Sequence, residues 1–352
     1  MIGHRAIDDP RNVLVKEFVR VVADLEADYF VFENVKGLTL GQQRRFLDEI
    51  MDRFEERGYD VVRSYSVLNA AGYGVPQDRR RLFLLGAKQG LQLPDYPRER
   101  TVPAGSRLES LDLPLGPSCL DALGDLPNAE DFEELLDSDE ATTIAWRNPG
   151  RYASELRALG NNAWRSGYPR QWDTNRLTAS MRTSHTEISR RRFAETDGGK
   201  VEPISRFFKL PREGVSNTLR AGTDSARGAF TSPRPIHYEF DRCVTVREMA
   251  RLHGYPDWFR FHRTKWHGAR QIGNSVPPPL ANAVAERILA ATGLYPTHPE
   301  HALELGNPDL LRLDMKAASE LFGVPVPIGR RDKKSGAKKR KQEEIEALRI
   351  SL

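Results

Sequence analysis

Glu33 and Asn34 are the first residues whose types and position could support chemistry. They directly follow Tyr29–Phe32, whose aromatic and β-branched side chains predict a buried strand. In open α/β sheets, ligands bind beyond the carboxyl ends of the strands. A carboxylate and an amide at that edge of the sheet would be placed to contact a ligand. The competing interpretation is a solvated charge at the end of a strand.

Two further groups of polar residues carry possible chemistry. Gly74–Arg81 reads Gly-Val-Pro-Gln-Asp-Arg-Arg-Arg and places three consecutive arginines where the strand expected over 80–87 begins. Gln271–Pro277 reads Gln-Ile-Gly-Asn-Ser-Val-Pro. Each group also has a simpler interpretation: arginines solvated beside a strand, and a Gly-Asn turn before a helix that begins with proline.

Alternating helices and strands before residue 90 would position the first two groups. Apolar residues at steps of three and four predict helices over 11–27 and 42–57. Strands are expected over 29–33, 61–68 and 80–87. This order predicts a piece of an α/β sheet rather than a whole one.

Fewer elements can be predicted in the later part of the chain. Short helices are expected over Cys119–Leu123 and near Leu313–Leu321. Thr245 and Glu248 form a capping-box pattern, which predicts that a helix begins there. A further helix, which begins with proline, is expected to include Leu280.

Charge is distributed unevenly along a chain whose formal net charge is +4. Segment 87–143 carries a net charge of −9, whereas segment 145–240 carries +8, with 15 arginines among its 17 basic residues. Segment 330–341 carries +7 and is expected to be disordered. Such a basic block can be a solvated face, but because the arginine fork suits phosphates and guanine edges, nucleic acid is a candidate partner of equal standing.

Several classes of protein are not expected. The sequence has no apolar run of 18 residues and no signal-peptide core, so we expect no membrane span and a cytoplasmic protein. Its two cysteines, Cys119 and Cys243, are too few for a disulfide scaffold or a zinc site of their own. We therefore expect no metal.

Four segments, taken in order, carry a family resemblance. They are Phe-Glu-Asn-Val at Phe32–Val35, the Gly74–Arg81 loop, Thr245–Pro256 and Gln271–Pro277. This set resembles the later half of a DNA (cytosine-5) methyltransferase of the bacterial restriction–modification type, over about residues 9–289. Four motifs in this order, flanking a basic insert, are more specific than any one of them alone.

The resemblance implies roles for four residues in methyl transfer to carbon 5 of a cytosine flipped out of the helix. Glu33 would protonate or hydrogen-bond ring nitrogen 3, and Asn34 would help to hold its loop. Arg81, the second arginine of the Gln-x-Arg-x-Arg motif, would lie near the carbonyl oxygen at carbon 2. Arg79 would contact the DNA backbone or brace the loop.

The resemblance also implies cofactor and DNA contacts. Gly273, Asn274 and Ser275 would line a pocket for S-adenosylmethionine. Double-stranded DNA would be read in the major groove by arginine, asparagine and glutamine side chains. The residues expected to contact DNA are Gln77, Arg190, Arg191, Arg192 and Arg220.

The fold class implied is α/β, with a partial Rossmann-like methyltransferase sheet and a smaller, loop-rich target recognition domain. Residues 1–90 would be the C-terminal half of the catalytic sheet, and 91–144 an acidic connecting segment. Residues 145–240 would be the target recognition domain. Residues 241–295 would return to the catalytic domain as helices, and 296–352 would be a C-terminal extension with the basic tail.

Two motifs of the family are missing. The chain has neither a Phe-x-Gly-x-Gly cofactor turn nor a Pro-Cys nucleophile. Cys119 and Cys243 are poor substitutes, because both follow Glu33 in the sequence whereas the nucleophile of the family precedes the corresponding glutamate. We therefore expect this chain alone to be inactive and S-adenosylmethionine binding to require the missing N-terminal part. The start could be assigned too late, the gene could be split with a separate N-terminal methyltransferase polypeptide, or the chain could be a decayed remnant.

Two alternative functions remain open from the sequence. The chain could be a non-catalytic DNA-binding remnant, or the DNA-recognition subunit of a split enzyme. An RNA methyltransferase of the same lineage is a further possibility, but the long insert between Gln77 and Thr245 suits a reader of the DNA groove better.

Overall fold

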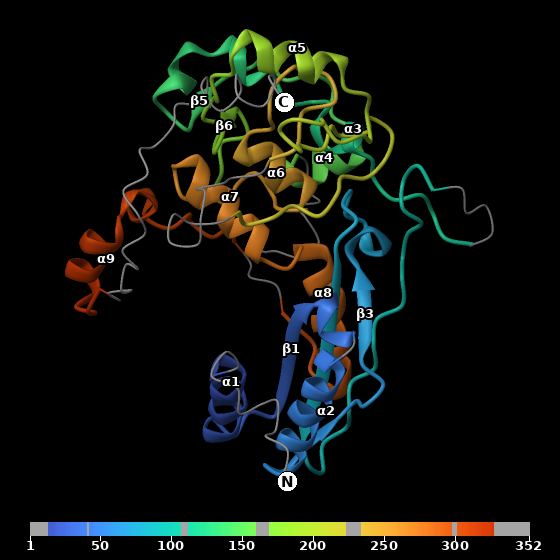
Figure 1. The fold of residues 1–352 in the computed structure, drawn as a ribbon. Coiled ribbons are helices and arrows are strands. Elements are labelled where there is room, and N and C mark those ends of the chain that lie inside the picture. The colour runs from blue at the N-terminus through green and yellow to red at the C-terminus, as the bar shows by residue number, and fades with distance from the viewer. Residues whose placement is uncertain are drawn as a thin grey trace, which may run out of the picture.

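The chain folds into a sheet-containing part and a loop-rich part, shown at the bottom and top of Figure 1. The computed structural model describes most of the chain, and the basic tail and the first residues of the expected helix 11–27 lie outside the described ranges. Those ranges are 13–40, 42–106, 112–159, 169–222, 234–297 and 301–326.

The main sheet is built around one long central strand. Its four strands are β1 (Tyr29–Val35), β2 (Tyr59–Val61), β3 (Ser66–Asn69) and β4 (Arg80–Lys88). β4 pairs with β1 along one edge and with both β2 and β3 along the other. All three pairings are antiparallel.

The α/β class is confirmed, but a Rossmann-like sheet is not clearly seen. Such a sheet is mostly parallel, whereas β4 runs opposite to each of its neighbours among the described strands. The single strand expected over 61–68 is also wrong. It is divided into β2 and β3, and the chain between them, which includes the exposed Arg63 and Ser64, leaves the ladder.

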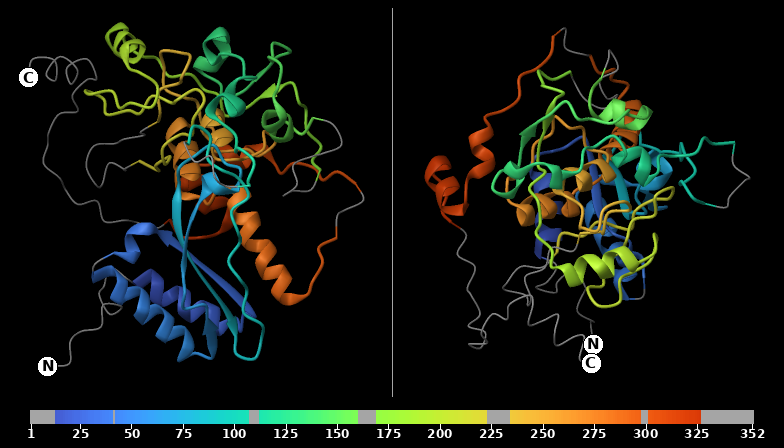
Figure 2. Two further views of the ribbon diagram at one scale, coloured as in Figure 1. Left: turned by 90° about the vertical axis from the view of Figure 1, so that its right-hand side faces the viewer. Right: turned by 90° about the horizontal axis from the view of Figure 1, so that it is seen from above.

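Helices cover both faces of this sheet. α1 (Val13–Asp24) and α2 (Gln42–Glu55) pack on one face, close to their predicted positions. α8 (Pro278–Thr292) begins with the expected proline and packs on the other face. Figure 2 (left) shows α8 in orange on the opposite side of the strands from the blue helices.

The alternation of side chains along β4 explains this layering. Leu82 and Leu84 point into the core formed with α1 and α2, whereas Phe83 and Leu85 pack against Leu280 of α8 and its neighbours. These four residues are all buried, as expected for a strand that is covered on both faces.

The loop-rich part has its own core, which contains mainly helices. α6 lies at its centre, and α3 contacts both α4 and α6. The helices and strands of this part are α3 (Cys119–Leu123), β5 (Ala141–Thr142), α4 (Arg151–Leu156), β6 (Arg176–Leu177), α5 (Glu187–Glu195), α6 (Val246–Leu252) and α7 (Lys265–Asn274). A short helix further along the chain, α9 (Met315–Phe322), lies close to its predicted position.

Two segments pack differently from what the expected domain boundaries imply, namely 91–144 and 241–295. The acidic segment 91–144 is more than a connector, because Cys119, Leu123 and Leu135 belong to the core that contains α6. α6 and α7 also pack there rather than on the sheet, so among the helices of segment 241–295 only α8 reaches the sheet core.

Local signals predicted some of these helices and not others. α6 begins with the predicted capping box, in which the Thr245 and Glu248 side chains bond to each other's backbone amides. α7 was not predicted, and Gly273 and Asn274, for which a turn was the simpler interpretation, both lie in its last turn. Five 3-10 turns complete the described elements: Lys36–Thr39, Ala70–Tyr73, Ala129–Asp131, Glu133–Leu136 and Pro308–Arg312. Over the described ranges, no helix combines the length and apolarity needed to cross a membrane.

Candidate active site

The structure brings Glu33 and Arg81 together at one end of the main sheet. In the register of β1 with β4, Glu33 faces Phe83 while Arg81 faces Val35, so the two charged residues are diagonal neighbours on one face. The Arg81 Nε lies 3.0 Å from a carboxylate oxygen of Glu33. Their side chains are 13% and 28% exposed, so the pair is partly closed off from solvent but still accessible.

Burial shifts the pKa values of Glu33 and Arg81 in opposite directions. Desolvation raises the pKa of Glu33 above its ordinary value, even though the positive charges of Arg81 and Arg79 oppose the shift. Desolvation likewise lowers the pKa of Arg81, against the opposing effect of Glu33. A carboxyl group with a raised pKa beside a guanidinium can both donate a proton and stabilise negative charge.

Arg79 acts as a brace behind this pair. Its side chain is 1% exposed. Its guanidinium donates to the carbonyl of Leu219 at 2.9 Å and to the carbonyls of Gly273 and Ser275, both at 2.8 Å. Burial, followed by the charge of Arg81, lowers the pKa of Arg79 to about 10. One guanidinium therefore ties the start of β4 to two distant segments.

Gln77 is also fully buried, at 0% exposed. Its amide nitrogen donates to the carbonyl of Leu252 at 3.2 Å, and its amide oxygen accepts from the backbone amide of Leu219 at 3.1 Å. In this structure the Gln77 side chain is enclosed and its amide is already bonded within the protein, so it is not placed to contact DNA. Gln77 joins the Gly74–Arg81 loop, which we call the site loop, to α6 and to the segment around Leu219.

The segment Ser216–Arg220 runs along the site loop and is fastened to it. The Asp78 amide donates to the Ser216 carbonyl at 2.8 Å, and the Thr218 hydroxyl donates to the Asp78 carbonyl at 2.6 Å. With the bonds of Gln77 and Arg79 to Leu219, these contacts fix Ser216–Arg220 relative to the site. We call this segment the recognition strip.

The three residues expected to line a cofactor pocket lie at the end of α7, but they differ in accessibility. Gly273 is buried, and Ser275 is partly buried with its hydroxyl donating to the Ile272 carbonyl at 2.9 Å. Asn274 is exposed. Among these three residues, only the Asn274 side chain is open to a ligand.

Replacing Gly273 with alanine is expected to separate α7 from the recognition strip. An added Cβ would lie 2.3 Å from the Ala221 backbone nitrogen and 2.5 Å from the Arg220 carbonyl carbon, and neither backbone can rotate away. We expect the free energy of unfolding to fall by about 1–3 kcal/mol in a urea titration. Gly37→Ala is the matched control, since nothing lies within 4 Å of that Cβ. Equal stabilities of the two variants would contradict the close approach.

The arginines expected to contact DNA lie in different surroundings. Arg190 forms an ion pair with Glu130, and Arg192 lies 3.5 Å from a carboxylate oxygen of Glu202. Arg191 and Arg220 are exposed. Segment charge alone could not distinguish these cases, because the acidic partners lie far away in the sequence or face the helix from another loop.

One residue of this site was not singled out from the sequence. His253 is 0% exposed and lies between two parts of the site, with Nδ1 2.9 Å from the Gln77 amide nitrogen and Nε2 3.2 Å from the Ser275 carbonyl oxygen. Burial, then the charge of Arg79, lowers its pKa well below the usual value, so the ring is neutral at pH 7. The sequence signal that could have identified His253 is its position in the Thr245–Pro256 motif.

Neither cysteine lies at this site. Cys119 is in the core around α6, and Cys243 packs with Phe193 and Ile236. Burial raises the pKa of both thiols, that of Cys243 to about 11. In the part of the chain that the structure describes, no group of three or more His, Cys, Asp or Glu residues could hold a metal ion.

Comparison with known proteins supports one family. Residues 1–290 match the family described as C-5 cytosine-specific DNA methylase. The chain is 53% identical to the type II methyltransferase M.XorII of Xanthomonas oryzae over 93% of this chain and 74% of that protein. It is 32% identical to M1.HphI of Haemophilus parahaemolyticus over 82% of this chain and 63% of that protein.

A solved structure supports the same likeness at the level of the fold. It is a DNA modification methyltransferase encoded within an Escherichia coli prophage, and it is 28% identical to this chain with a TM-score of 0.58. The alignment covers 82% of this chain and 76% of that one.

Proposed function

Because the chain belongs to the C-5 cytosine-specific DNA methylase family, we propose that it binds a cytosine flipped out of duplex DNA and supports methyl transfer to carbon 5. We further propose that it serves a type II restriction–modification system, because its relatives M.XorII and M1.HphI are named as type II methyltransferases. The main sheet would then be one part of the catalytic sheet of such an enzyme.

The observation that carries this proposal is the half-buried Glu33–Arg81 pair. Methylation at carbon 5 requires addition of a thiolate to carbon 6 of the cytosine ring, which makes carbon 5 nucleophilic. In the proposal, protonated Glu33 donates to ring nitrogen 3, and its raised pKa supports that protonation state. Arg81, 3.0 Å from Glu33, stabilises the charge that develops on the carbonyl oxygen at carbon 2.

Asn34, Arg79 and Gln77 act as positioning residues in this proposal. The Asn34 side chain accepts from the Val35 amide at 2.8 Å and so shapes the end of β1 just after Glu33. Gln77 and Arg79 hold the site loop against the recognition strip. A shift of this loop would move Arg81 relative to the base.

S-adenosylmethionine supplies the methyl group when it is bound. Of the three residues at the end of α7, Asn274 fits a ligand-binding role because its amide is exposed. Gly273 and Ser275 instead hold Arg79, since their carbonyls accept from its guanidinium. We propose that the cofactor contacts Asn274 and not the Gly273 α-carbon, which faces the Arg220–Ala221 backbone.

We also propose that neither Cys119 nor Cys243 provides the thiolate, because both are buried away from Glu33 and have raised pKa values. The expected result for the purified 352-residue chain is binding to duplex DNA without methyl transfer. Binding should weaken about a hundredfold between about 50 and 200 mM salt if about four phosphates are contacted. Transfer is measured as labelled methyl groups incorporated from S-adenosylmethionine.

The same experiment separates the two halves of the proposal. M.XorII, assayed in parallel, is the positive control for methyl transfer. Absence of any duplex binding would contradict the DNA-directed function. Methyl transfer that is lost in Cys119→Ser or Cys243→Ser would contradict the exclusion of the two thiols and leave the DNA-directed function standing.

A further inference from the structure

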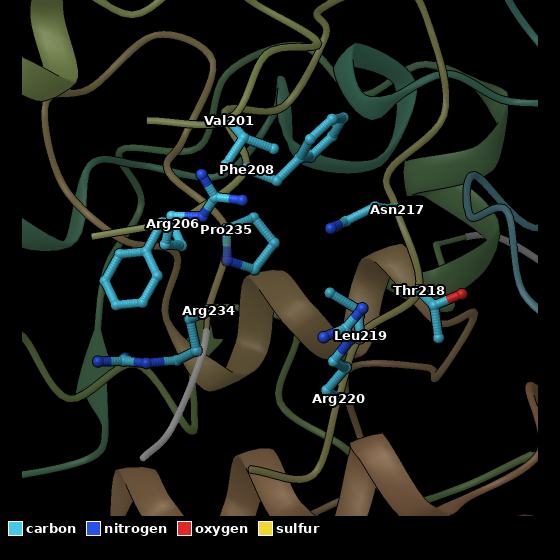
Figure 3. Close-up of a pocket in the computed structure, with 10 residues that line it drawn as sticks. Val201, Arg206, Phe208, Asn217, Thr218, Leu219, Arg220, Arg234 and Pro235 are labelled. Carbon is cyan, nitrogen blue, oxygen red and sulfur yellow. The ribbon is translucent and has the colours of Figure 1, made fainter. Parts of the chain in front are cut away.

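A basic cavity lies beside the recognition strip, in the loop-rich part of the molecule. Its volume is about 280 Å³, and it opens between segment 201–208, the strip and residues 234–235. Figure 3 shows Arg206 and Asn217 reaching toward the same space from opposite sides, with Arg220 below them. Among the described residues, its lining contains three arginines and no acidic residue, so it presents hydrogen-bond donors and positive charge.

Two of these arginines differ from Arg190 and Arg192 on α5, because neither has a carboxylate partner among the residues that the structure describes. Arg206 and Arg220 are exposed, and neither forms an ion pair with any residue that the structure describes. Arg190 and Arg192, by contrast, lie beside Glu130 and Glu202. For an arginine without an acidic neighbour, contacting a phosphate or a base costs less free energy, because no existing ion pair has to be broken.

The third arginine is part of the cavity wall. Arg234 is 8% exposed and donates to the Val244 carbonyl at 3.1 Å and to the Thr183 hydroxyl at 2.8 Å. Its guanidinium is therefore held within the protein. Arg206 and Arg220 are the arginines that remain available to a ligand in the cavity.

Arg206 is held at the tip of a tight turn. Its backbone amide donates to the Glu202 carbonyl at 2.9 Å, and the buried Glu202 carboxylate accepts from the Ile204 amide at 3.1 Å. Arg206 has φ of 62°, in the left-handed region that favours glycine. An arginine is thus present where the backbone alone would favour a glycine, and such a residue is a candidate for a role in function.

Asn217 and Arg220 stand on the recognition strip, whose position relative to Glu33 and Arg81 is fixed. The strip is bonded to the site loop through the Asp78 amide, Gln77 and Arg79. A base held against the strip would therefore lie at a defined distance from the base held by Glu33. This coupling is what an enzyme needs to methylate one cytosine within a specific sequence.

We propose that Arg206 and Asn217 read base edges in the major groove of DNA and so determine part of the recognition sequence. The arginine fork matches the N7 and O6 acceptors of guanine, and the asparagine amide matches N7 and the amino group of adenine. Arg220 adds positive charge for a neighbouring phosphate. This inference rests on the proposed function and moves the centre of DNA reading from α5 to the cavity.

The test is selection of bound sequences from short DNA duplexes with a randomised core. The full chain is compared with Arg206→Gln, Arg206→Gly and Asn217→Ala. Arg45→Gln is the control, because Arg45 is exposed on α2 in the sheet-containing part, away from the cavity. Arg206→Gly relieves the left-handed backbone, so its thermal stability should equal or exceed that of the wild type and loss of reading cannot be ascribed to unfolding.

We expect wild type and Arg45→Gln to enrich the same sequence. Both Arg206 variants should lose discrimination at one guanine position by roughly 10- to 100-fold, and Asn217→Ala at one adenine position by a similar factor. Enrichment of the unchanged sequence by the Arg206 and Asn217 variants would overturn the inference while the proposed function stands. Uniform weakening with a salt slope lower by about one would make Arg206 a phosphate contact and also overturn it.

Two results for the wild type itself complete the test. Binding to duplexes without enrichment of any sequence would overturn the inference, because the cavity then reads nothing. Absence of binding to any duplex would overturn the proposed function on which the inference rests.

Discussion

Replacing Arg251 with methionine is expected to lower the free energy of unfolding by about 3–5 kcal/mol. Arg251 lies on α6, is 0% exposed, and donates to the carboxylates of Asp257 and Asp125 at 2.6 and 2.9 Å. Both carboxylates are themselves buried. The loss of the guanidinium would leave two negative charges with weaker partners in a region of low dielectric.

The remaining partners of these carboxylates are too distant to compensate. Arg157 lies 3.7 Å from Asp125, and Arg247 lies 3.7 Å from Asp257. Although burial opposes the charge on Arg251, the attraction of Asp257 and Asp125 outweighs it and raises the pKa of Arg251. The guanidinium therefore stays charged at neutral pH.

Urea unfolding of Arg251→Met is the measurement, with Arg151→Met as the matched control. Arg151 forms an exposed pair with Glu155 on α4, and its side chain is 85% exposed, so its loss should cost less than about 0.5 kcal/mol. Adding Asp125→Asn and Asp257→Asn to Arg251→Met should recover part of the lost stability, because the unpaired charges are then gone. If Arg251→Met were as stable as Arg151→Met, the buried cluster of Arg251, Asp125 and Asp257 would not stabilise α6.

The same cluster bears on the active site through α6. Leu252 and His253 follow Arg251 directly, and both bond to the Gln77 amide group. Movement of α6 would therefore loosen the site loop as well as the core. Arg251→Met is expected to weaken DNA binding even at urea concentrations where the chain is still folded.

Local sequence signals predicted the elements whose formation depends on neighbouring residues. The capping box of Thr245 and Glu248 and the helix Cys119–Leu123 are found where they were expected. Each is determined by side chains within one turn of the backbone they satisfy. The strand before Glu33 follows in the same way from its aromatic and β-branched residues.

Long-range contacts explain what could not be predicted. The missing side chain of Gly273 lets α7 approach the Arg220–Ala221 backbone, and nothing in the adjacent sequence reveals that contact. The diagonal pairing of Glu33 with Arg81 depends on strand register, which a single sequence does not give. Charge counts likewise could not reveal that Arg190 lies beside Glu130 while Arg206 has no described acidic partner.

The affinity for an unpaired cytosine is expected to fall as the pH rises through the raised pKa of Glu33. The protonated carboxyl donates to ring nitrogen 3, whereas the ionised form cannot, so each pH unit above that pKa should cost about a factor of ten in affinity. The probe is a duplex with one cytosine opposite an abasic position, because an unpaired base is less costly to flip. Binding is measured by fluorescence anisotropy at constant ionic strength.

Two comparisons isolate the contribution of Glu33. Thymine carries a hydrogen on ring nitrogen 3, so it gains nothing from a protonated carboxyl, and a duplex with unpaired thymine should lack the pH-dependent increment. In Glu33→Gln the amide nitrogen donates at any pH, so the affinity for cytosine should be high and independent of pH. Thermal unfolding of this variant verifies that loss of the ion pair with Arg81 leaves the sheet intact.

The sign of the pH effect distinguishes a proton donor from a simple partner of Arg81. If Glu33 served only to hold Arg81, its ionised form would be the useful one, and binding would strengthen or stay constant as the pH rises. The same reasoning makes Glu33→Gln informative, since that change would then weaken binding at every pH. A rise in cytosine affinity with pH, together with weak binding by Glu33→Gln, would therefore assign the Glu33–Arg81 pair a structural role and remove the observation on which the proposed function chiefly rests.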